Sequence, residues 1–552
     1  MVGGLLNLVA VGNQNIILHG NPQKTFWSST YKRITNFGIQ NFRLDYEGLR
    51  QLSVTNETTY SFKVKRYAEL LMDTYLIIQL PDIYSPIYPN NTSNKWVPYE
   101  YKWIKNIGAM MIKSIKFTIG GSLIQQLTGT DMVILANRDL SATHKKKWDE
   151  MIGNTPDMYD PANAFGRKNI YPNVAYYKGI LPEPSIRGKQ LRIPLPIWWG
   201  FMSQQAFPLV ALQYNILQID ITLRPLRELF QIKDVLDIEN NHPVIAPNMT
   251  IQEHQFYRFI YPPPNMELIY AAPLSSNWNE NTHLSCQYCF LSEEEAKLFA
   301  LHPQKYLIKE YHQTVFNNVA VADKVWLQNS TGLVLNWMFL FQRNDVPLRN
   351  EWSNFTNWEY DYLPTPISLL NILFNNSEGI GPFNNYQGYG SNKDLSLTYL
   401  QGTGDFHPEN QKSILVQLGI TFDGTVREEV RSGNMYLHDQ QYLVSDGYGS
   451  SSLHGLYGYH FCLDTSPFQL QPSGAINLSK FSKIEFEFTT ITPPIDPQST
   501  FMTICDPELN QQIGIEKAMY KLYKYGFNLY VLEERYNVLT FLSGNAGMMN
   551  AR

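Results

Sequence analysis

The chain has 552 residues, a mass of 63.8 kDa and a formal net charge of −5. Charged residues make up only 17% of it, against about 25% in an average soluble protein, whereas aromatic residues reach 14%. Surface that is poor in charge is typical of chains that contact other chains. The longest basic run is Lys145–Lys147, so the sequence lacks the basic arm that direct nucleic-acid packaging requires.

The N-terminal run MVGGLLNLVAVGNQ is apolar but too short to cross a bilayer, and it lacks the basic start of a signal peptide. We therefore expect a soluble protein that is made in the cytosol. Leu5, Leu6, Leu8 and Val9 suit a segment that needs a partner surface. The alternative is a strand that packs on its own domain.

The four cysteines, Cys286, Cys289, Cys462 and Cys505, are too few for a disulfide scaffold and suit a reducing compartment. Cys286 and Cys289 have CxxC spacing inside a strand-like run, where residues i and i+3 point to opposite faces. We interpret them as buried structural thiols, with metal or redox chemistry as the alternative.

Strand patterns dominate the sequence. Apolar and polar residues alternate with a period of two, which predicts antiparallel sheets with one polar face. The clearest runs are Phe62–Lys65, Ser114–Gly120, Leu217–Arg224, Leu333–Phe341 and Ile484–Phe488. Gly120–Gly121 predicts a hairpin turn. Two helices are expected, at Ser292–Ala300 with Ser292 as N-cap and Glu295 completing a capping box, and at Asp131–Leu140. The pattern favours β-sandwiches over βαβ units.

The sequence also repeats itself distantly, because Pro208–Ile219 matches Pro472–Ile484 with one extra residue. Two similar halves indicate a duplicated sandwich. We predict an N-terminal segment at 1–25, a first sandwich at 26–228, a linker leading into the next strand at 229–264, and a second sandwich at 265–552. The Gly- and Asn-rich stretch 344–409 is expected to be a long loop insertion in the second sandwich.

Catalytic patterns are scarce. The sequence contains no HxH, HExxH, GxSxG, GxxxxGK[ST] or GxGxxG motif, and neither a cofactor nor a metal site is predicted. His454 and His460 lie close together without an accompanying carboxylate pattern. Glu428–Glu429 and Glu533–Glu534 could supply a glycosidase pair, but such adjacent carboxylates usually mark a solvated edge or a helix. We therefore predict that the protein is not an enzyme.

Several N-x-[S/T] sequons occur, at a frequency near chance for a chain this rich in asparagine. Asn90, Asn354 and Asn375 are candidate glycosylation sites, but only if the protein enters a secretory lumen. The other sequons lie at Asn56, Asn91, Asn248, Asn329 and Asn477.

A series of short motifs resembles, in order along nearly the whole chain, the major capsid proteins of the nucleocytoplasmic large DNA viruses. The motifs in the first half are Gly3–Ala10, Gly20–Gln23, Thr25–Phe26, Tyr31–Arg33, Thr35–Phe37, Ile119–Gly121, Met151–Asn154, Pro194–Pro196 with Trp198, and Ala211–Tyr214. Those in the second half are Tyr306–Ile308, Gln471–Gly474 with Asn477 and Ser479, Tyr536–Leu539 and Ser543–Gly544. A single tetrapeptide of this kind is a weak signal, whereas the ordered set is specific. The stretches 344–409 and 141–189 look long for the smaller members of the family.

The resemblance implies an all-β chain of two tandem eight-stranded antiparallel jelly-roll sandwiches with long inserted loops and few short helices. It implies a homotrimer that forms a six-sided capsomer of an icosahedral shell, assembled in the host cytoplasm. Neighbouring capsomers, minor capsid proteins and penton proteins are the implied partners. The N-terminal segment, with Leu5, Leu6, Leu8 and Val9, would lie on the inner surface towards the minor capsid proteins and the internal viral membrane, and the inserted loops would form the outer towers.

Two other functions are compatible with this pattern. One is a related role in assembly, as a double jelly-roll scaffold or a minor capsid paralogue, which abundance in purified virions would distinguish. The other is a carbohydrate-binding or carbohydrate-active jelly-roll protein, whose many aromatics would stack on sugars. The absence of a signal peptide and of a catalytic constellation argues against the second.

Overall fold

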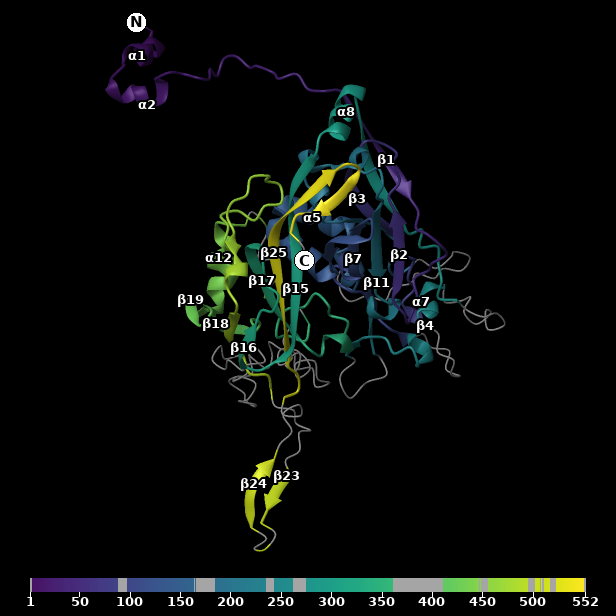
Figure 1. Ribbon diagram of the computed structural model, residues 1–552. Helices are drawn as coiled ribbons and strands as arrows, with labels where there is room; N and C mark the ends of the chain where they lie inside the picture. The colour runs from purple at the N-terminus through teal and green to yellow at the C-terminus, as the bar shows by residue number, and fades with distance from the viewer. Residues whose placement is uncertain are drawn as a thin grey trace.

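The computed structural model describes residues 2–87, 97–162, 164, 184–234, 243–261, 275–360, 411–445, 447, 455–494, 502–506, 508, 511–516 and 523–550. Two β-sandwiches stand side by side, and their long strands run along one shared direction (Figure 1). The candidate sites Asn90, Asn375 and His454, and most of the expected loop insertion at 344–409, lie outside the described residues.

The first sandwich consists of two facing antiparallel sheets. One sheet has the order β1–β14–β3, with β9 and β10 also pairing β3, and the other has the order β2–β11–β7–β8. The strands are β1 (Phe37–Leu44), β2 (Thr58–Lys63), β3 (Leu70–Gln79), β7 (Ile112–Ile119), β8 (Ser122–Leu127), β9 (Gln190–Pro194), β10 (Phe207–Pro208), β11 (Leu217–Leu223) and β14 (His283–Leu291).

The second sandwich follows the same plan. One sheet has the order β15–β25–β17–β20, with β21 pairing β17 and β26 pairing β25, and the other has the order β16–β22–β18–β19. The strands are β15 (Gln304–Val319), β16 (Ala322–Trp326), β17 (Leu333–Arg343), β18 (Leu415–Phe422), β19 (Thr425–Ser432), β20 (Tyr457–His460), β21 (Ile476–Asn477), β22 (Ile484–Thr490), β25 (Phe527–Leu542) and β26 (Asn545–Met548).

The two strand orders correspond element by element. β15, β25, β17 and β20 take the places of β1, β14, β3 and β9, and β16, β22, β18 and β19 take those of β2, β11, β7 and β8. The repeat detected in the sequence covers β10, a 3₁₀ turn and the start of β11 in one half, and β21, a 3₁₀ turn and the start of β22 in the other. The predicted duplication and the fold of two tandem antiparallel jelly rolls are confirmed.

The passage between the sandwiches lies later in the chain than predicted. β14 pairs with both β1 and β3, so it is the closing strand of the first sandwich rather than part of the second. The expected linker at 229–264 includes β12 (Phe230–Lys233) and α7 (Tyr257–Ile260), which pack on the first sandwich through Phe230 and Phe259. A long insertion therefore separates β11 from β14, and helix α8 (Glu293–Leu301) makes the connection between the sandwiches.

The alternating sequence pattern explains why the strands pack as they do. In β11, Leu217, Ile219, Ile221 and Leu223 are buried, whereas the residues between them are partly exposed. Ile219 lies opposite both Phe62 and Phe117, so one apolar row crosses three strands. Burial of each such side chain contributes about 1.5–3 kcal/mol. Gly120 and Gly121 both have positive φ, 56° and 86°, as a two-residue hairpin between β7 and β8 requires.

Both predicted helices are present. The helix predicted at Asp131–Leu140 is α4 (Gly129–Asp139), and Thr128 caps it in a reciprocal capping box with Asp131. The helix predicted at Ser292–Ala300 is α8, with Ser292 at the N-cap but without the expected side-chain hydrogen bond. The described residues also form α1 (Gly3–Val9), α2 (Ile16–His19), α3 (Ile107–Met110), α5 (Ala142–Met151), α6 (Pro156–Tyr159) and α12 (Gln440–Tyr442), the last preceded by η13 (Met435–Asp439).

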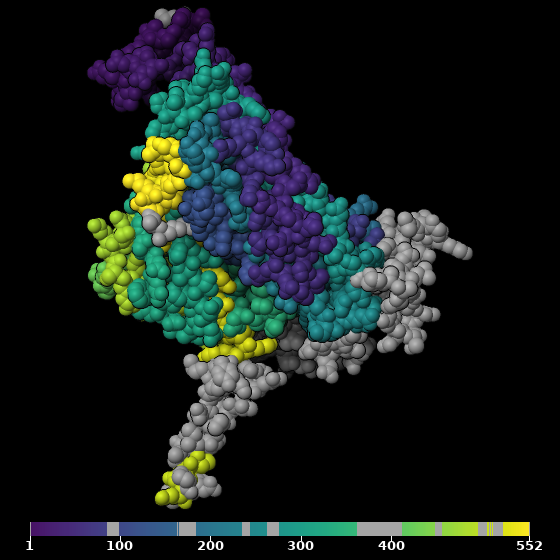
Figure 2. Space-filling model, turned by 45° about the vertical axis from the view of Figure 1, so that its right-hand side comes forward, coloured from purple at the N-terminus to yellow at the C-terminus, as the bar shows by residue number. Residues whose placement is uncertain are grey.

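The remaining strands lie in insertions at one end of the molecule. They are β4 (Pro86–Ile87), β5 (Val97–Pro98), β6 (Tyr101–Trp103), β12, β13 (Val244–Ile245), β23 (Met502–Cys505) and β24 (Gln512–Glu516). In Figure 1 the β23–β24 hairpin projects from this end, and the N-terminal segment with α1 and α2 leaves from the opposite end beside α8. Figure 2 shows the same polarity. The molecule therefore has two chemically and structurally different ends.

Candidate functional site

The two sandwiches meet in an interface within the chain that combines apolar and polar contacts. Helix α4 and strand β8 of the first sandwich lie on the outward face of the β15–β25–β17 sheet of the second. Tyr311, Met338 and Leu532 of that sheet belong to the same buried apolar cluster as the α4 side chains. The Gln313 amide donates to Asp131 at 3.3 Å across the interface. The apolar core of the first sandwich thus extends onto the outer face of the second sandwich, whose own core is a separate cluster.

Contacts continue at both ends of this interface. Towards the end of the molecule that carries α8, Trp198 lies 5.2 Å from Tyr306 and Phe207 lies 5.3 Å from Phe541, between ring centroids. Towards the other end, the Asn350 amide donates to the backbone carbonyls of Arg227 and Phe230 at 2.8 and 2.9 Å, and the Trp352 indole donates to that of Glu228 at 2.9 Å. Contacts along the whole length fix the angle between the two sandwiches.

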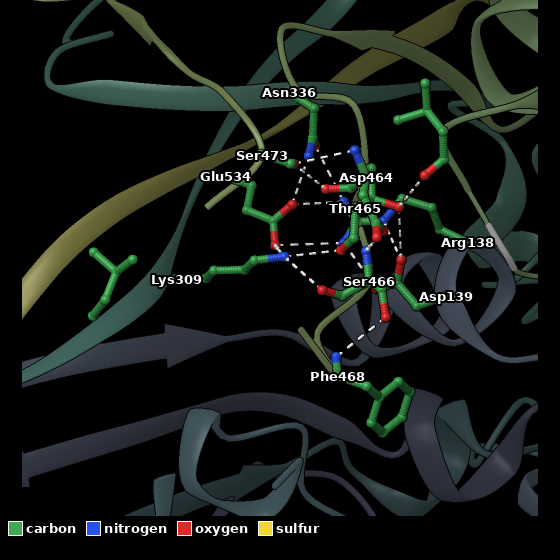
Figure 3. A network of polar contacts seen from close by, with 12 residues as sticks. Arg138, Asp139, Lys309, Asn336, Asp464, Thr465, Ser466, Phe468, Ser473 and Glu534 are labelled. Atoms are coloured by element: carbon green, nitrogen blue, oxygen red, sulfur yellow. Dashed lines mark hydrogen bonds and ion pairs between the residues drawn. The ribbon is translucent and has the colours of Figure 1, made fainter. Parts of the chain in front are cut away.

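A buried polar cluster occupies the centre of the interface (Figure 3). Arg138, in the last turn of α4, donates to both oxygens of Asp139 at 2.7 and 2.8 Å and to Oε2 of Glu534 in β25 at 2.8 Å. Its Nη1 also lies 3.2 Å from the amide oxygen of Asn336 in β17. Lys309 in β15 approaches Oε1 of Glu534 at 3.7 Å. Two cations therefore face two carboxylates.

The loop after β20 completes the cluster. Lys309 donates to the backbone carbonyls of Thr465 and Ser466 at 2.8 and 3.3 Å, and the Thr465 hydroxyl donates to Asp139 at 3.2 Å. The Ser445 hydroxyl donates to the backbone carbonyl of Arg138. Elements of both sandwiches thus supply the hydrogen bonds that a buried charge requires.

The charges of this cluster depend on one another. Burial alone would raise the pKa of Glu534, but Arg138 and Lys309 outweigh burial and lower the pKa to about 2. The same two carboxylates raise the pKa of Arg138, although burial opposes them. Glu534 is therefore ionised at every physiological pH, and its charge requires Arg138 to stay in place. The cluster of Arg138, Asp139, Lys309 and Glu534 is therefore a structural contact that joins the two sandwiches, and it is called the lock below.

Sequence reasoning located Glu533–Glu534 but assigned the pair to a solvated edge or helix, which is wrong. Adjacent residues of a strand point to opposite faces, so Glu534 enters the interface between the sandwiches while Glu533 enters the second sandwich itself. There Glu533 accepts from the Trp337 indole at 2.8 Å and from the Ser330 hydroxyl. The missed signal was the length of β25, whose flanking residues continue the strand pattern on both sides of the pair.

The second carboxylate pair, Glu428–Glu429, does lie on a solvated edge in β19. Glu429 is exposed, and Glu428 accepts from the Tyr459 hydroxyl at 3.2 Å and pairs with Arg431. His460, at the end of β20, has both ring nitrogens buried, and neither has a hydrogen-bond partner among the residues that the structure describes. Burial together with Arg138 lowers its pKa to about 3.

The N-terminal segment has the opposite character to the interface. Leu5, Leu6, Leu8 and Val9, singled out from the sequence, all lie in α1 and are exposed, and no residue of α1 is buried. The exposed apolar residues continue through Ile17 and Trp27. Figure 1 shows this segment extending away from the sandwiches beyond α8. A segment with this much exposed apolar surface is suited to binding a partner.

The four cysteines and the candidate glycosylation site Asn354 differ in accessibility. Cys286, Cys289 and Cys462 are buried free thiols, and Cys505 is exposed. Cys286 and Cys289 belong to different apolar clusters on the two faces of β14, which agrees with the expected structural role. The Asn354 side chain is buried and donates to the Trp358 carbonyl at 2.9 Å, so this sequon is not accessible to a modifying enzyme in the folded chain.

The described residues show neither a metal cluster nor a membrane-spanning helix. In this part of the chain no group of three or more His, Cys, Asp or Glu side chains is placed to hold a metal ion. No described helix is long and apolar enough to cross a membrane. A cavity of about 670 Å³ beside β1 contains Glu280, whose carboxylate accepts from the Tyr60 hydroxyl at 2.8 Å and the Leu52 amide at 3.1 Å, as a structural group would.

Comparison with known proteins relates the chain to viral shells. Residues 25–261 match the family described as the major capsid protein N-terminus. The major capsid protein of Chrysochromulina ericina virus is 28% identical over 57% of this chain and 53% of its own length. That of Paramecium bursaria Chlorella virus 1 is 23% identical over 100% of both chains. The matched region thus spans about half the length of the first of these relatives.

The fold is also similar to that of a solved capsid. In the quasi-atomic capsid structure of the same Chlorella virus, one chain superposes with a TM-score of 0.58 at 17% identity. The superposition covers 96% of this chain and 100% of that chain. The arrangement of two sandwiches is therefore shared over nearly the whole length.

Proposed function

Because the chain is a homologue of the major capsid proteins of large DNA viruses, we propose that it is the structural subunit of an icosahedral viral shell. In this proposal three copies form a six-sided capsomer, and the protein has no catalytic role. The observation that carries the proposal is the identical strand order of the two sandwiches. A site of six-fold shape needs six similar wedges, and a chain that contains two wedges supplies them as a trimer.

The rigid interface between the sandwiches supports this function. A tile in a large shell must keep a fixed angle between its wedges, and the apolar contact between the sandwiches and the Arg138–Glu534 lock fix that angle within each chain. A chain whose two domains moved independently would not define a flat hexagon.

The proposal is tested by the mass and shape of the purified protein. We expect native mass spectrometry to give three times the chain mass of 63.8 kDa, and electron microscopy to show hexagonal particles in end-on views. A chain that remains monomeric at the concentrations used for assembly would overturn the proposal. Abundance in purified virions would separate the shell subunit from a scaffold or a minor capsid paralogue.

We further propose that the N-terminal segment lies on the inner side of the shell, where minor capsid proteins and the internal membrane would meet it. The exposed Leu5, Leu6, Leu8 and Val9 support this role, as does their position at the end of the molecule opposite the β23–β24 hairpin. Neighbouring capsomers and penton proteins would be the lateral partners, and the insertions at the hairpin end would face outwards.

The segment is tested by Leu6→Asp, with Leu49→Asp as the control because Leu49 is also an exposed leucine but lies in the loop after β1. We expect both variants to fold and to form capsomers. Only Leu6→Asp should reduce shell assembly, since it places a charge within the apolar segment. Normal virion yields with Leu6→Asp would show that the segment has no such role.

A further inference from the structure

The first sandwich contains a cavity that the proposed shell function does not use. It has a volume of about 670 Å³ and lies between the loop after β1 and the segment that leads into β14. Because β14 runs from this cavity towards α8, the cavity lies at the end of the sheet away from α8, on the flank that carries β1 (Figure 1). Figure 2 turns this flank, coloured purple, towards the viewer. Cavities of about 300–1,000 Å³ with a few fixed polar groups are typical of sites for small ligands.

Hydrogen bonds hold both walls of the cavity in place. In the wall after β1, the Tyr46 hydroxyl donates to the Arg50 carbonyl at 2.9 Å, and the Leu52 amide donates to the Glu280 carboxylate at 3.1 Å. In the wall before β14, the Trp278 indole donates to a backbone carbonyl of β3 at 2.7 Å. The Glu280 carboxylate therefore ties one wall to the other. A ligand that enters the cavity meets fixed groups, and binding does not require a loop to become ordered.

The uncharged side chains that line the cavity suit a saccharide. Trp278 is partly buried and contributes an aromatic ring, on which the apolar C–H face of a sugar ring can pack. Gln51, Asn279 and Asn281 are exposed and contribute an amide from each wall of the cavity. An amide both donates and accepts hydrogen bonds, as neighbouring sugar hydroxyls require. A wholly apolar ligand would leave these amides without partners.

The charges of the cavity favour an anionic ligand. Arg43 is paired with Asp45 at 2.7 Å, so these two charges offset each other. Glu280 is buried, and its carboxylate is engaged by the Leu52 amide. Arg50 is exposed and lines the cavity, and its guanidinium forms no ion pair within the part of the chain that the structure describes. A guanidinium binds a carboxylate through two parallel hydrogen bonds.

We propose that this cavity binds an acidic saccharide, whose carboxylate pairs with Arg50 and whose ring packs on Trp278. Sialic acids and uronic acids both belong to this class, because each carries a carboxylate on a sugar ring. The inference goes beyond the proposed function, since the cavity lies within one chain and needs no second copy. It is a binding site only, and no bond of the saccharide is broken there.

The experiment measures binding of saccharides to the purified full-length protein by saturation-transfer NMR titration. The probes are sialyllactose, a hyaluronan oligosaccharide that contains glucuronic acid, and lactose as the neutral comparator. Arg50→Gln removes the cationic group, and the fold should tolerate it because the Arg50 backbone carbonyl, not its side chain, accepts the hydrogen bond from Tyr46. Asn279→Asp places a carboxylate of nearly the same shape in the opposite wall.

Arg33→Gln is the matched control, because Arg33 is also exposed but lies in the part of the chain that precedes β1. Unchanged circular dichroism establishes that each variant is folded, and Asn279→Asp carries the test if Arg50→Gln does not fold. We expect at least one acidic probe to bind roughly tenfold or more tightly than lactose. Arg50→Gln and Asn279→Asp should each weaken that binding by a similar factor, and Arg33→Gln should leave it unchanged.

The two acidic probes identify the source of the carboxylate, because sialyllactose carries it on a sialic acid and the hyaluronan fragment on a uronic acid. Three results would overturn the inference: no saturation transfer to any probe, equal affinity for lactose, or binding that survives both Arg50→Gln and Asn279→Asp. A protein that forms trimers but gives one of these results overturns this inference alone and leaves the proposed function intact.

Discussion

Replacing Arg138 by methionine should be one of the most destabilising single changes at the interface between the sandwiches. The side chain of Arg138 is fully buried and binds two carboxylates of a cluster that contains two cations and two anions. Arg138→Met keeps much of the volume but leaves Asp139 and Glu534 with Lys309 as the one remaining cation of the cluster. Removing one partner of a buried pair costs about 3–5 kcal/mol, because an uncompensated charge stays behind.

The pH dependence gives a second signature of this change. In the wild type the folded-state pKa of Glu534, about 2, lies below its ordinary value of 4.5. The ion pair therefore contributes stability that is present above pH 4.5 and is lost as the pH falls towards 2. In Arg138→Met, burial dominates and raises the pKa of Glu534, so lowering the pH towards 5 should increase the stability of the variant.

Urea denaturation of the wild type and of Arg138→Met at pH 5 and pH 7.5 measures the loss of stability in the variant and its pH dependence. The control is Lys297→Met, which removes an exposed ion pair with Glu293 in α8 and should change the free energy of unfolding by less than about 0.5 kcal/mol. A loss below about 1 kcal/mol for Arg138→Met, or an unchanged pH profile, would refute the interpretation of the cluster as a lock.

Three further predictions concern packing, protonation and thiol access. Gly129→Ala should lower the free energy of unfolding, measured by urea denaturation, by about 1–3 kcal/mol, because the added Cβ would lie 2.2 Å from the Ala109 carbonyl oxygen. The control Gly547→Ala should leave it unchanged, because no other atom lies within 4 Å of the added Cβ. Burial raises the pKa of Asp131 to about 6. This residue therefore contributes up to about 3 kcal/mol to the free energy of unfolding at low pH, and the contribution is lost as the pH rises from about 4 to 6. Asp131→Asn should remove this pH dependence of the free energy of unfolding. In the native protein a thiol reagent should label Cys505 and leave Cys286, whose pKa burial raises to about 12, unlabelled until the chain unfolds; equal labelling rates would contradict this assignment.

The sequence allowed a correct prediction of the sheets because their pattern is local. Alternation in Leu217–Leu223 and Ile484–Phe488 directly reports which face of each strand is buried. The distant repeat around Pro208 and Pro472 predicted the duplication for the same reason, since each copy must bury the same row of side chains.

The features that were not predicted depend on partners far away in the chain. β14 lies 60 residues after the end of β11, and its membership of the first sandwich is decided by pairing with β1 and β3, which no local pattern encodes. Glu534 was assigned to solvent because its partner, Arg138, is 396 residues away. Burial of charge is a property of tertiary contact, and one sequence read by itself gives no sign of it.

The charges buried between the sandwiches bear on when that contact forms. The buried charges of Arg138 and Glu534 are costly whenever they are separated, so they suit a contact that forms once, during folding, between domains joined by α8. A contact between chains must instead leave both surfaces soluble before assembly. Val430 in β19 and Tyr442 in α12 meet that requirement. Both are exposed to water in the single chain, and their burial would lower the free energy. The duplicated chain thus places its charged lock in the contact within the chain, whereas the edge formed by β19 and α12 carries exposed apolar side chains instead.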